Sequence, residues 1–230
     1  MREIVMDTET TGLDPNSGDR IVEIGAVELF NHMPTGKTYH QYINPQRDMP
    51  EGAFAVHGLS AEFLSDKPLF TDVAQAFLDF VGDSKMVIHN AAFDMKFLNA
   101  ELKWVERPEL PWAQALDTLA IARKKFPGAQ NSLDALCRRF GITTERELHG
   151  ALLDSEILAE VYLELIGGRQ PDFALSIVSN KDASDDGAAA NWSPPKRPSP
   201  LPTRISEAEV EAHKEFVENL GESAVWNQFK

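Results

Sequence analysis

The stretch that decides the fold is residues 2–9, REIVMDTE, in which an apolar, strand-like run ends on two acidic residues. Two further strand-like stretches follow it, RIVEIGAVELF at residues 20–30 and GKTYHQYINP at residues 36–45. Three consecutive strands with short connections are typical of an antiparallel meander. The sequence therefore predicts a sheet in which the first strand carries Asp7 and Glu9 near its end.

Helix-like segments alternate with short apolar strands after this meander. The helical segments repeat apolar residues at three- and four-residue spacing. The expected elements are helix 71–82, strand 85–90, helix 91–102, strand 115–118 and helices at about 118–125, 131–140 and 151–166. Strands first, followed by alternating helices and strands, predict an α/β fold with a mixed sheet that has helices packed on its faces.

The size and composition of the chain restrict what it can be. Its 230 residues, 43% of them hydrophobic, are enough for one full domain core and a smaller appendage. No apolar run approaches the roughly 20 residues that cross a membrane, and residues 1–10 do not resemble a signal peptide. We therefore expect a cytoplasmic protein without a membrane partner. The single cysteine, Cys137, lies among helix-periodic apolar residues and is expected to be a buried structural thiol.

The net charge of −14 is unfavourable for binding nucleic acid, which normally needs a basic surface. Divalent cations bound to a cluster of carboxylates would reverse the local charge. With such a cluster, the affinity for DNA is expected to be weak and concentrated at the metals. A partner that delivers the DNA would then be an advantage.

Three regions of the chain differ in composition. Residues 1–166 contain the alternating elements, whereas residues 167–203 contain six of the 14 prolines together with GG, SDDGAAA and SPPKRPSPLP. This second region is predicted to be a flexible linker. Residues 204–230 form a tail that regains helical character.

Asp7 and Glu9 are candidate metal ligands. Side chains at positions i and i+2 of a strand point to the same face, so the two carboxylates would lie together and repel each other. Cations relieve that repulsion, and hard oxygen ligands suit Mg²⁺ or Mn²⁺. A solvated strand end is the alternative interpretation, since a chain with 36 acidic residues contains such pairs by chance.

Two further acids stand at the beginnings of helices. Asp94 falls in the first turn of a helix, with Asn90 as the expected N-cap. Asp154 lies near the start of a strongly apolar helix, just after His149. An acid at either place also suits the helix dipole, and His149 taken alone could be a loop residue. All four acids nevertheless fall at the ends of strands or helices, where sites in α/β sheets assemble.

Three sequence blocks resemble those of the DEDDh exonucleases, also called the DnaQ-like family, which have a ribonuclease-H-like fold. The blocks are DTETTGL at residues 7–13, HNAAFD at residues 89–94 and HGALLD at residues 149–154, and the resemblance covers about residues 3–166. It implies a mixed five-stranded sheet flanked by helices and an enzyme that removes nucleotides from 3′ ends by hydrolysis. It also implies two divalent metal ions, Mg²⁺ or Mn²⁺, as cofactors.

The resemblance assigns a role to each catalytic position. Asp7 is implied to bridge the two ions, and Glu9 and Asp154 to complete one metal site. Asp94 is implied to hold water on the other metal. His149, whose reference pKa is near ~6.5, would accept the proton of the attacking water.

Residues beside these acids are implied to contact the substrate. Leu13 and Phe93 stand where the family stacks or wedges the terminal bases, and His57 lies in EGAFAVHGLS, which resembles a nucleotide-contacting segment. Phe93 could instead be a core aromatic residue, and His57 a turn residue. The remaining histidines are expected to be structural or exposed, namely His32, His40, His89 and His213.

The linker contains a candidate docking peptide. Gln170, Phe173 and Leu175 in QPDFAL resemble the short glutamine-led peptide by which bacterial replication proteins bind the sliding clamp. The pattern is loose, and a chance match is the alternative.

The tail is predicted to contain an amphipathic helix. Ser206 and Glu209 form a capping box, and Ile205 and Val210 a hydrophobic staple, while Gly221 can end the helix. Its apolar residues are Val210, Phe216, Val217 and Leu220, followed by Val225, Trp226 and Phe229. A segment of this length cannot bury such a surface by itself. It either folds back on the domain or docks on another protein, for which we expect the catalytic subunit of a replicative DNA polymerase.

Proofreading is the function that the resemblance implies, in which single-stranded or frayed 3′ ends of DNA are trimmed for a replicative polymerase. The main alternative is a stand-alone nuclease of this family that acts on short RNA or single-stranded ends, but such an enzyme would lack the long linker and the tail. A non-catalytic binding module on the same fold is a further alternative. The presence of acids and a histidine at all five catalytic positions argues against it.

Overall fold

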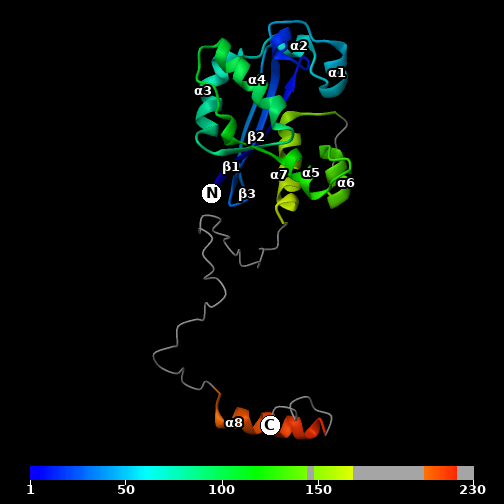
Figure 1. Cartoon of the computed structure of the whole chain (residues 1–230). Helices are drawn as coiled ribbons and strands as arrows, with labels where there is room; N and C mark the ends of the chain where they lie inside the picture. The colour runs from blue at the N-terminus through cyan, green and yellow to red at the C-terminus, as the bar shows by residue number, and fades with distance from the viewer. Residues whose placement is uncertain (144–147, 168–204, 222–230) are drawn as a thin grey trace, which may run out of the picture. The chain divides into compact units, whose positions relative to one another are not determined.

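The computed structural model describes residues 1–143, 148–167 and 205–221 (Figure 1). The chain divides into two units, residues 1–175 and 176–230, and each is described by itself. In the described part of the chain, no helix is long and apolar enough to span a membrane.

The first unit is built on a single sheet of five strands. They are β1 (Arg2–Thr10), β2 (Ile21–Phe30), β3 (Met33–Tyr42), β4 (Lys85–Ile88) and β5 (Ala115–Asp117), in the order β3-β2-β1-β4-β5. The first three strands are antiparallel, while β4 runs parallel to β1 and β5 parallel to β4. The predicted meander and mixed sheet are both confirmed.

Seven α-helices surround this sheet in the described residues of the first unit. They are α1 (Glu51–His57), α2 (Ala61–Leu64), α3 (Phe70–Val81), α4 (Ala91–Trp104), α5 (Thr118–Lys125), α6 (Leu133–Phe140) and α7 (Ala151–Leu165). Two 3₁₀ turns, η1 (Pro15–Ser17) and η2 (Trp112–Gln114), complete the connections. The sequence did not predict α1 or α2, because both are short and each buries a single residue, so neither carries a helical apolar repeat.

The alternation of side chains along β1 separates the two faces of the sheet. Ile4 and Met6 pack in the core formed with α3 and α4, whereas Val5 packs in the core formed with α7. The same alternation sends Asp7 and Glu9 toward the α7 face. Helices α5 and α6 pack with α7 in a third cluster, in which Cys137 is buried as predicted.

The beginning of α7 lies directly against β2. A Cβ atom on Gly25 would be 2.1 Å from the backbone nitrogen of Leu152, so only glycine allows this approach. Ser155 Oγ donates a hydrogen bond to the Gly25 carbonyl at 2.9 Å, and Glu23 accepts one from the Ala151 amide at 3.1 Å. These contacts fix the first turn of α7, which carries Asp154, relative to the sheet.

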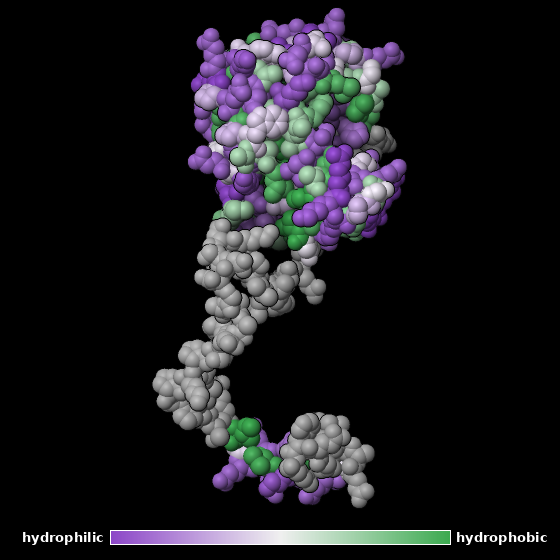
Figure 2. All heavy atoms as spheres, in the orientation of Figure 1, coloured by the Kyte–Doolittle hydropathy of each residue, from purple (hydrophilic) through white to green (hydrophobic). Residues whose placement is uncertain are grey.

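The second unit contains the helix α8 (Glu207–Asn219) in its described part. The predicted capping box is confirmed, since the Ser206 amide donates to Glu209 at 2.8 Å and the Glu209 amide donates to Ser206 Oγ at 3.3 Å. The apolar residues of this helix are largely exposed (Figure 2), with relative exposures of 69% at Ile205, 43% at Val210, 58% at Phe216 and 44% at Leu220. The predicted clamp peptide, with Gln170, Phe173 and Leu175, and the residues Trp226 and Phe229 lie outside the described residues.

Candidate active site

The four acids and the histidine singled out in the sequence meet at one edge of the sheet. Ligand atoms of Glu9, His149 and Asp154 all lie within 4.8 Å of one another, which is close enough to share a metal ion. Asp7 interacts electrostatically with Asp94 and Glu9. The structure therefore brings together residues that are spread over almost 150 positions of the chain.

The electrostatics of this cluster favour cation binding. Burial raises the pKa of Asp7 well above its usual value, and the neighbouring carboxyls of Asp94, Glu9 and Glu23 raise it further. Burial also raises the pKa of Asp94 to about 7, although its Oδ1 accepts a hydrogen bond from Thr8 Oγ1 at 2.7 Å. Carboxylates that resist ionisation by themselves are stabilised by an added positive charge. This donor set of hard oxygens fits divalent cations such as Mg²⁺ or Mn²⁺.

His149 is held beside Asp154 while keeping contact with solvent. Its Nδ1 lies 2.9 Å from Asp154 Oδ2, and its side chain is 44% exposed compared with 4% for Asp154. An ionised carboxylate only accepts hydrogen bonds, so Nδ1 carries the proton and Nε2 is the basic nitrogen of the neutral ring. The His149 amide donates to the Val56 carbonyl at 3.1 Å, which ties this loop to α1.

A pocket of about 460 Å³ opens next to Glu9. Leu13, His57 and Phe93, the three predicted substrate contacts, all line it. Leu13 is 81% exposed and His57 is 5% exposed, while Phe93 is half-buried and packs against Phe97 with ring centres 5.0 Å apart. A partly exposed apolar wall beside a carboxylate cluster has the shape and chemistry to hold a nucleobase.

His57 is fixed in this pocket as a neutral ring. Its Nδ1 accepts a hydrogen bond from the Leu59 amide at 3.0 Å, so Nε2 carries the proton. Burial lowers the pKa of His57. The next residue, Gly58, adopts a φ of 72°, and a Cβ there would lie 2.6 Å from Leu148 Cδ1, beside His149. The pocket and the loop of His149 are thus packed against each other.

Several residues of the site were missed by the sequence interpretation. Thr8 bonds to Asp94, Glu23 adds negative charge near Asp7, and Val56 both lines the pocket and receives the His149 amide. The alternation of β1 could have shown that Thr8 faces α4. Asn90 stands at the N-cap of α4 as predicted but in a left-handed conformation, and it makes no side-chain cap.

The other histidines are structural or exposed, as predicted. His32 lies 2.7 Å from Glu3, and His40 lies 2.6 Å from Glu23. His89 is hydrogen-bonded through both ring nitrogens, and His213 is exposed on α8.

A fold of this kind with a carboxylate and histidine cluster at the end of β1 defines a class of nucleases. The chain matches the exonuclease family RNase_T over residues 4–162 and belongs to that family. It is a 3′-to-5′ exonuclease, and so a hydrolase, with divalent metal ions as cofactors.

Among its relatives is a protein named DNA polymerase III subunit epsilon from Rickettsia felis, to which it is 49% identical over 229 residues. The match covers 97% of this chain and 99% of that protein. The solved structure of exonuclease X in complex with 5′ overhanging duplex DNA is similar, with 27% identity, a TM-score of 0.57, and coverage of 71% of this chain and 90% of that one.

The fold is also shared with the nuclease domain of 3′hExo, a DEDDh family member solved with bound rAMP. The identity is 19%, the TM-score is 0.63, and the match covers 72% of this chain and 91% of that domain. The ribonuclease-H-like fold that the sequence blocks implied is therefore confirmed.

Proposed function

We propose that this chain proofreads DNA synthesis by removing terminal nucleotides from the 3′ end of a primer, as the exonuclease subunit of a bacterial DNA polymerase III core. The proposal rests on five residues that lie together at one edge of the sheet, namely Asp7, Glu9, Asp94, His149 and Asp154. The near full-length similarity to a subunit named epsilon supports the polymerase context, because it extends through the linker and the tail. This function would place the protein in the cytoplasm, with the replication machinery.

The acids of the cluster would hold two divalent cations, Mg²⁺ or Mn²⁺. Asp7 would bridge them, with Glu9 and Asp154 completing one site and Asp94 serving the other. When bound, the cations supply positive charge to the scissile phosphate and the leaving oxygen. Thr8 would keep Asp94 oriented through the 2.7 Å hydrogen bond.

His149 would take the proton from the attacking water. Its basic Nε2 is held in place by the bond from Nδ1 to Asp154, and its exposed position lets it reach a water molecule beside the cluster. A neutral imidazole near pH 7 is suited to this task.

The pocket beside Glu9 would hold the terminal nucleotide. Leu13 and Phe93 would contact the base by apolar packing, which tolerates any sequence as proofreading requires. The protonated Nε2 of His57 would donate to a polar atom of the same nucleotide.

The tail would tether the nuclease to the polymerase catalytic subunit. The exposed apolar residues Val210, Phe216 and Leu220 on α8 support this docking. Contact with the sliding clamp through Gln170, Phe173 and Leu175 remains a prediction from the sequence.

The catalytic proposal is tested with a labelled primer on a template, carrying either a matched or a mismatched 3′ terminus. We expect nucleoside monophosphates to be released faster from the mismatched end, because a frayed terminus reaches the pocket more easily. EDTA should stop the release. A single-stranded RNA of the same length is the comparison for the alternative function, and faster trimming of RNA than of mismatched DNA would contradict proofreading.

The tethering proposal is tested by co-elution of the full chain with the polymerase catalytic subunit. Replacing Val210 and Phe216 together with alanine should weaken binding at least tenfold without changing nuclease activity on single strands. Glu211→Ala on the same helix is the matched control. Undiminished co-elution of the double variant would place the binding surface elsewhere.

A further inference from the structure

One stretch of this acidic chain is rich in basic residues. Residues 123–139 contain five basic residues and one acidic residue, whereas the whole chain contains 22 basic and 36 acidic residues. This stretch forms the end of α5, the loop after it and most of α6. Positive charge gathered in one place is the electrostatic signature of a surface that binds a nucleic-acid backbone.

Two of the five basic residues have structural tasks. Lys125 Nζ donates to two backbone carbonyls at the end of α7, both at 3.1 Å. Arg139 stacks on the ring of Phe126 at 4.4 Å. The other three are exposed, namely Arg123, Lys124 and Arg138.

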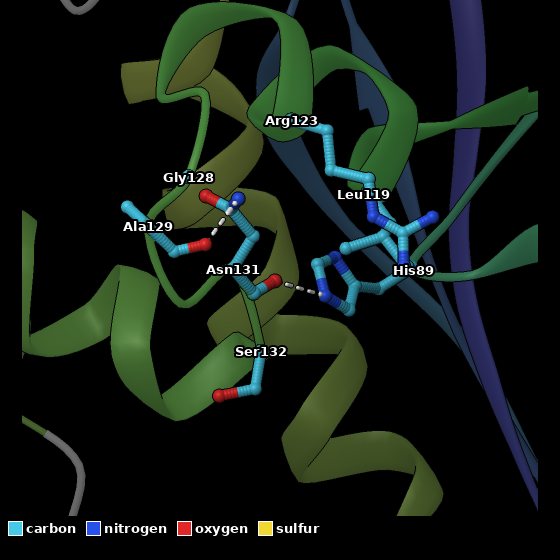
Figure 3. Close-up of a pocket in the computed structure, with 7 residues that line it drawn as sticks. All are labelled: His89, Leu119, Arg123, Gly128, Ala129, Asn131 and Ser132. Atoms are coloured by element: carbon cyan, nitrogen blue, oxygen red, sulfur yellow. Dashed lines mark hydrogen bonds between the residues drawn. The ribbon is translucent and has the colours of Figure 1, made fainter.

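Arg123 lines a pocket of about 540 Å³ between the end of β4 and the loop before α6 (Figure 3). Among the residues that the structure describes, the arginines in ion pairs are Arg2, Arg20 and Arg47. The Arg123 guanidinium therefore forms no ion pair among the described residues, while the Asp117 carboxylate lies near enough to act on the same His89 ring.

The wall of this pocket beside Arg123 is rigid (Figure 3). His89 Nδ1 lies 2.9 Å from Thr118 Oγ1, and Nε2 lies 2.9 Å from the Asn131 carbonyl (Figure 3). Burial lowers the pKa of His89, against the Asn131 carbonyl and Asp117, which raise it, and together with Arg123, which lowers it. The ring is bonded through both nitrogens and anchors the loop. The pocket thus presents the exposed Arg123 guanidinium beside a His89 ring that is held through both nitrogens.

The pocket lies along the same sheet edge as the catalytic acids. His89 directly follows β4, which pairs with β1 on one side and β5 on the other. Neighbouring strands are about 4.8 Å apart, so the pocket is roughly 5–10 Å along this edge from the strand that carries Glu9. A nucleic-acid strand that rises by about 3.4 Å or more per nucleotide covers this distance in two or three nucleotides.

We propose that Arg123 binds a backbone phosphate of single-stranded DNA two or three nucleotides before its 3′ end. The terminal nucleotide occupies the pocket of Leu13 and Phe93 at the end of β1, and the strand leaves across the ends of β4 and β5. The planar guanidinium can bind two phosphate oxygens at once. The positive charge of α5 and α6 adds attraction for the strand. The inference rests on the proposed catalytic site, because that site sets where the 3′ end lies.

Steady-state kinetics of the full chain with Mg²⁺ test the proposal on two substrates. One is a 12-nucleotide single strand, and the other is the p-nitrophenyl ester of thymidine 5′-monophosphate, which is too short to reach Arg123. We expect Arg123→Ala to raise KM for the 12-nucleotide strand about 3- to 10-fold and to leave the ester unchanged. The slope of log(kcat/KM) against log salt should become less steep by about 0.7, as for one lost phosphate contact.

Arg107→Ala is the matched control, since Arg107 is exposed and follows the far end of α4, whose 14 residues span roughly 20 Å. Arg123→Lys should recover most of the affinity. Equal KM values for Arg123→Ala and Arg107→Ala on the 12-nucleotide strand would overturn the proposal, as would an equal loss on both substrates. Failure of the wild-type protein to hydrolyse either substrate would instead reject the proposed catalytic site.

Discussion

Buried carboxylates beside the two ends of β1 lie in opposite electrostatic settings, with Glu28 on the neighbouring strand β2. At the amino end, Glu28 is paired with Arg2 and with Lys37, and hydrogen bonds from Arg2 and Thr35 lower the pKa of Glu28 to about 2. At the carboxyl end, burial raises the pKa of both Asp7 and Asp94. Within residues 1–143 and 148–167, neither of these acids forms an ion pair with a lysine or arginine.

The difference separates stability from function at the two ends of the sheet's central strands. A carboxylate that has its own cationic partner contributes to the folded state, whereas carboxylates crowded without one cost stability. Among the described residues, Asp7 and Asp94 at the carboxyl end form no ion pair with a lysine or arginine, and divalent cations supply the positive charge there. Isosteric replacement of a carboxylate by an amide at each end should therefore have opposite consequences.

Asp7→Asn should produce the greatest loss of function. Removal of a ligand expected to serve both cations should lower the release of nucleotides from single-stranded DNA by more than about 10³-fold. The metal-free variant should unfold at a higher denaturant concentration than metal-free wild type, because repulsion with Asp94 and Glu9 is relieved. A variant that kept a tenth of the wild-type rate would contradict the assignment of this end of the strand.

His149→Ala should act on turnover alone. The loss of the proton acceptor should lower kcat by about 10² to 10⁴ with little change in KM. The wild-type rate should fall on the acid side of neutrality, and the residual rate of the variant should not follow this profile. Equal kcat for variant and wild type between pH 6 and 9 would mean that His149 is a bystander.

Glu28→Gln should have the opposite pattern to Asp7→Asn. Loss of the charged partner of Arg2 and Lys37 should lower the free energy of unfolding by about 1–3 kcal/mol. The exonuclease rate should stay within twofold of wild type, since Glu28 lies at the far end of the sheet from the catalytic acids. A gain in stability, measured by denaturant unfolding, would contradict the comparison.

The carboxylates at the two ends should also make the free energy of unfolding depend on pH in different ways, with smaller effects than the substitutions above. The pKa of Asp94 is raised to about 7 in the fold. Its contribution to the free energy of unfolding is therefore fully present below about pH 4 and is lost as the pH rises through about 7. The pKa of Glu28 is lowered to about 2, so its contribution is present above about pH 4.5 and is lost as the pH falls toward 2.

Denaturant unfolding in EDTA measures both windows. Asp94→Asn should reduce the loss of stability between pH 4 and 7, with Asp7 contributing the remainder, and Glu28→Gln should leave that loss unchanged. Addition of Mg²⁺ should restore the stability of the wild-type protein at pH 7. If the stability of wild type and of Asp94→Asn depended on pH in the same way, the raised pKa of Asp94 would be contradicted.

Most of the fold was predictable because its elements have strong local patterns. Buried residues recur with the spacing of a strand or a helix in these elements, as in the apolar runs of β1 and β2 and the repeats of α3, α4 and α7. The short helices α1 and α2 were missed because they lie on the surface and have no such period. The residues of the candidate site were predictable because three sequence blocks place acids at the ends of strands and helices.

The residues that hold the site together were not predictable in the same way. Glu23 gave no signal of its role, since it bonds to α7 through an amide 128 residues later in the chain. In the sequence Gly25 is an ordinary strand residue, and only its close contact with the start of α7 shows that glycine is required there. The same is true of Arg123, which forms no ion pair among the described residues and lies beside the end of β4.

Sequence alone therefore determined which residues carry charge, which face of each element is apolar and which family motifs are present. These properties depend on residues close together in the chain, where spacing translates directly into direction. Only the tertiary structure decided which acids are crowded together, which histidine nitrogen is basic and where a strand of DNA could run. Those properties depend on distances between elements, which are set by how Gly25, Ser155 and the helices pack against the sheet.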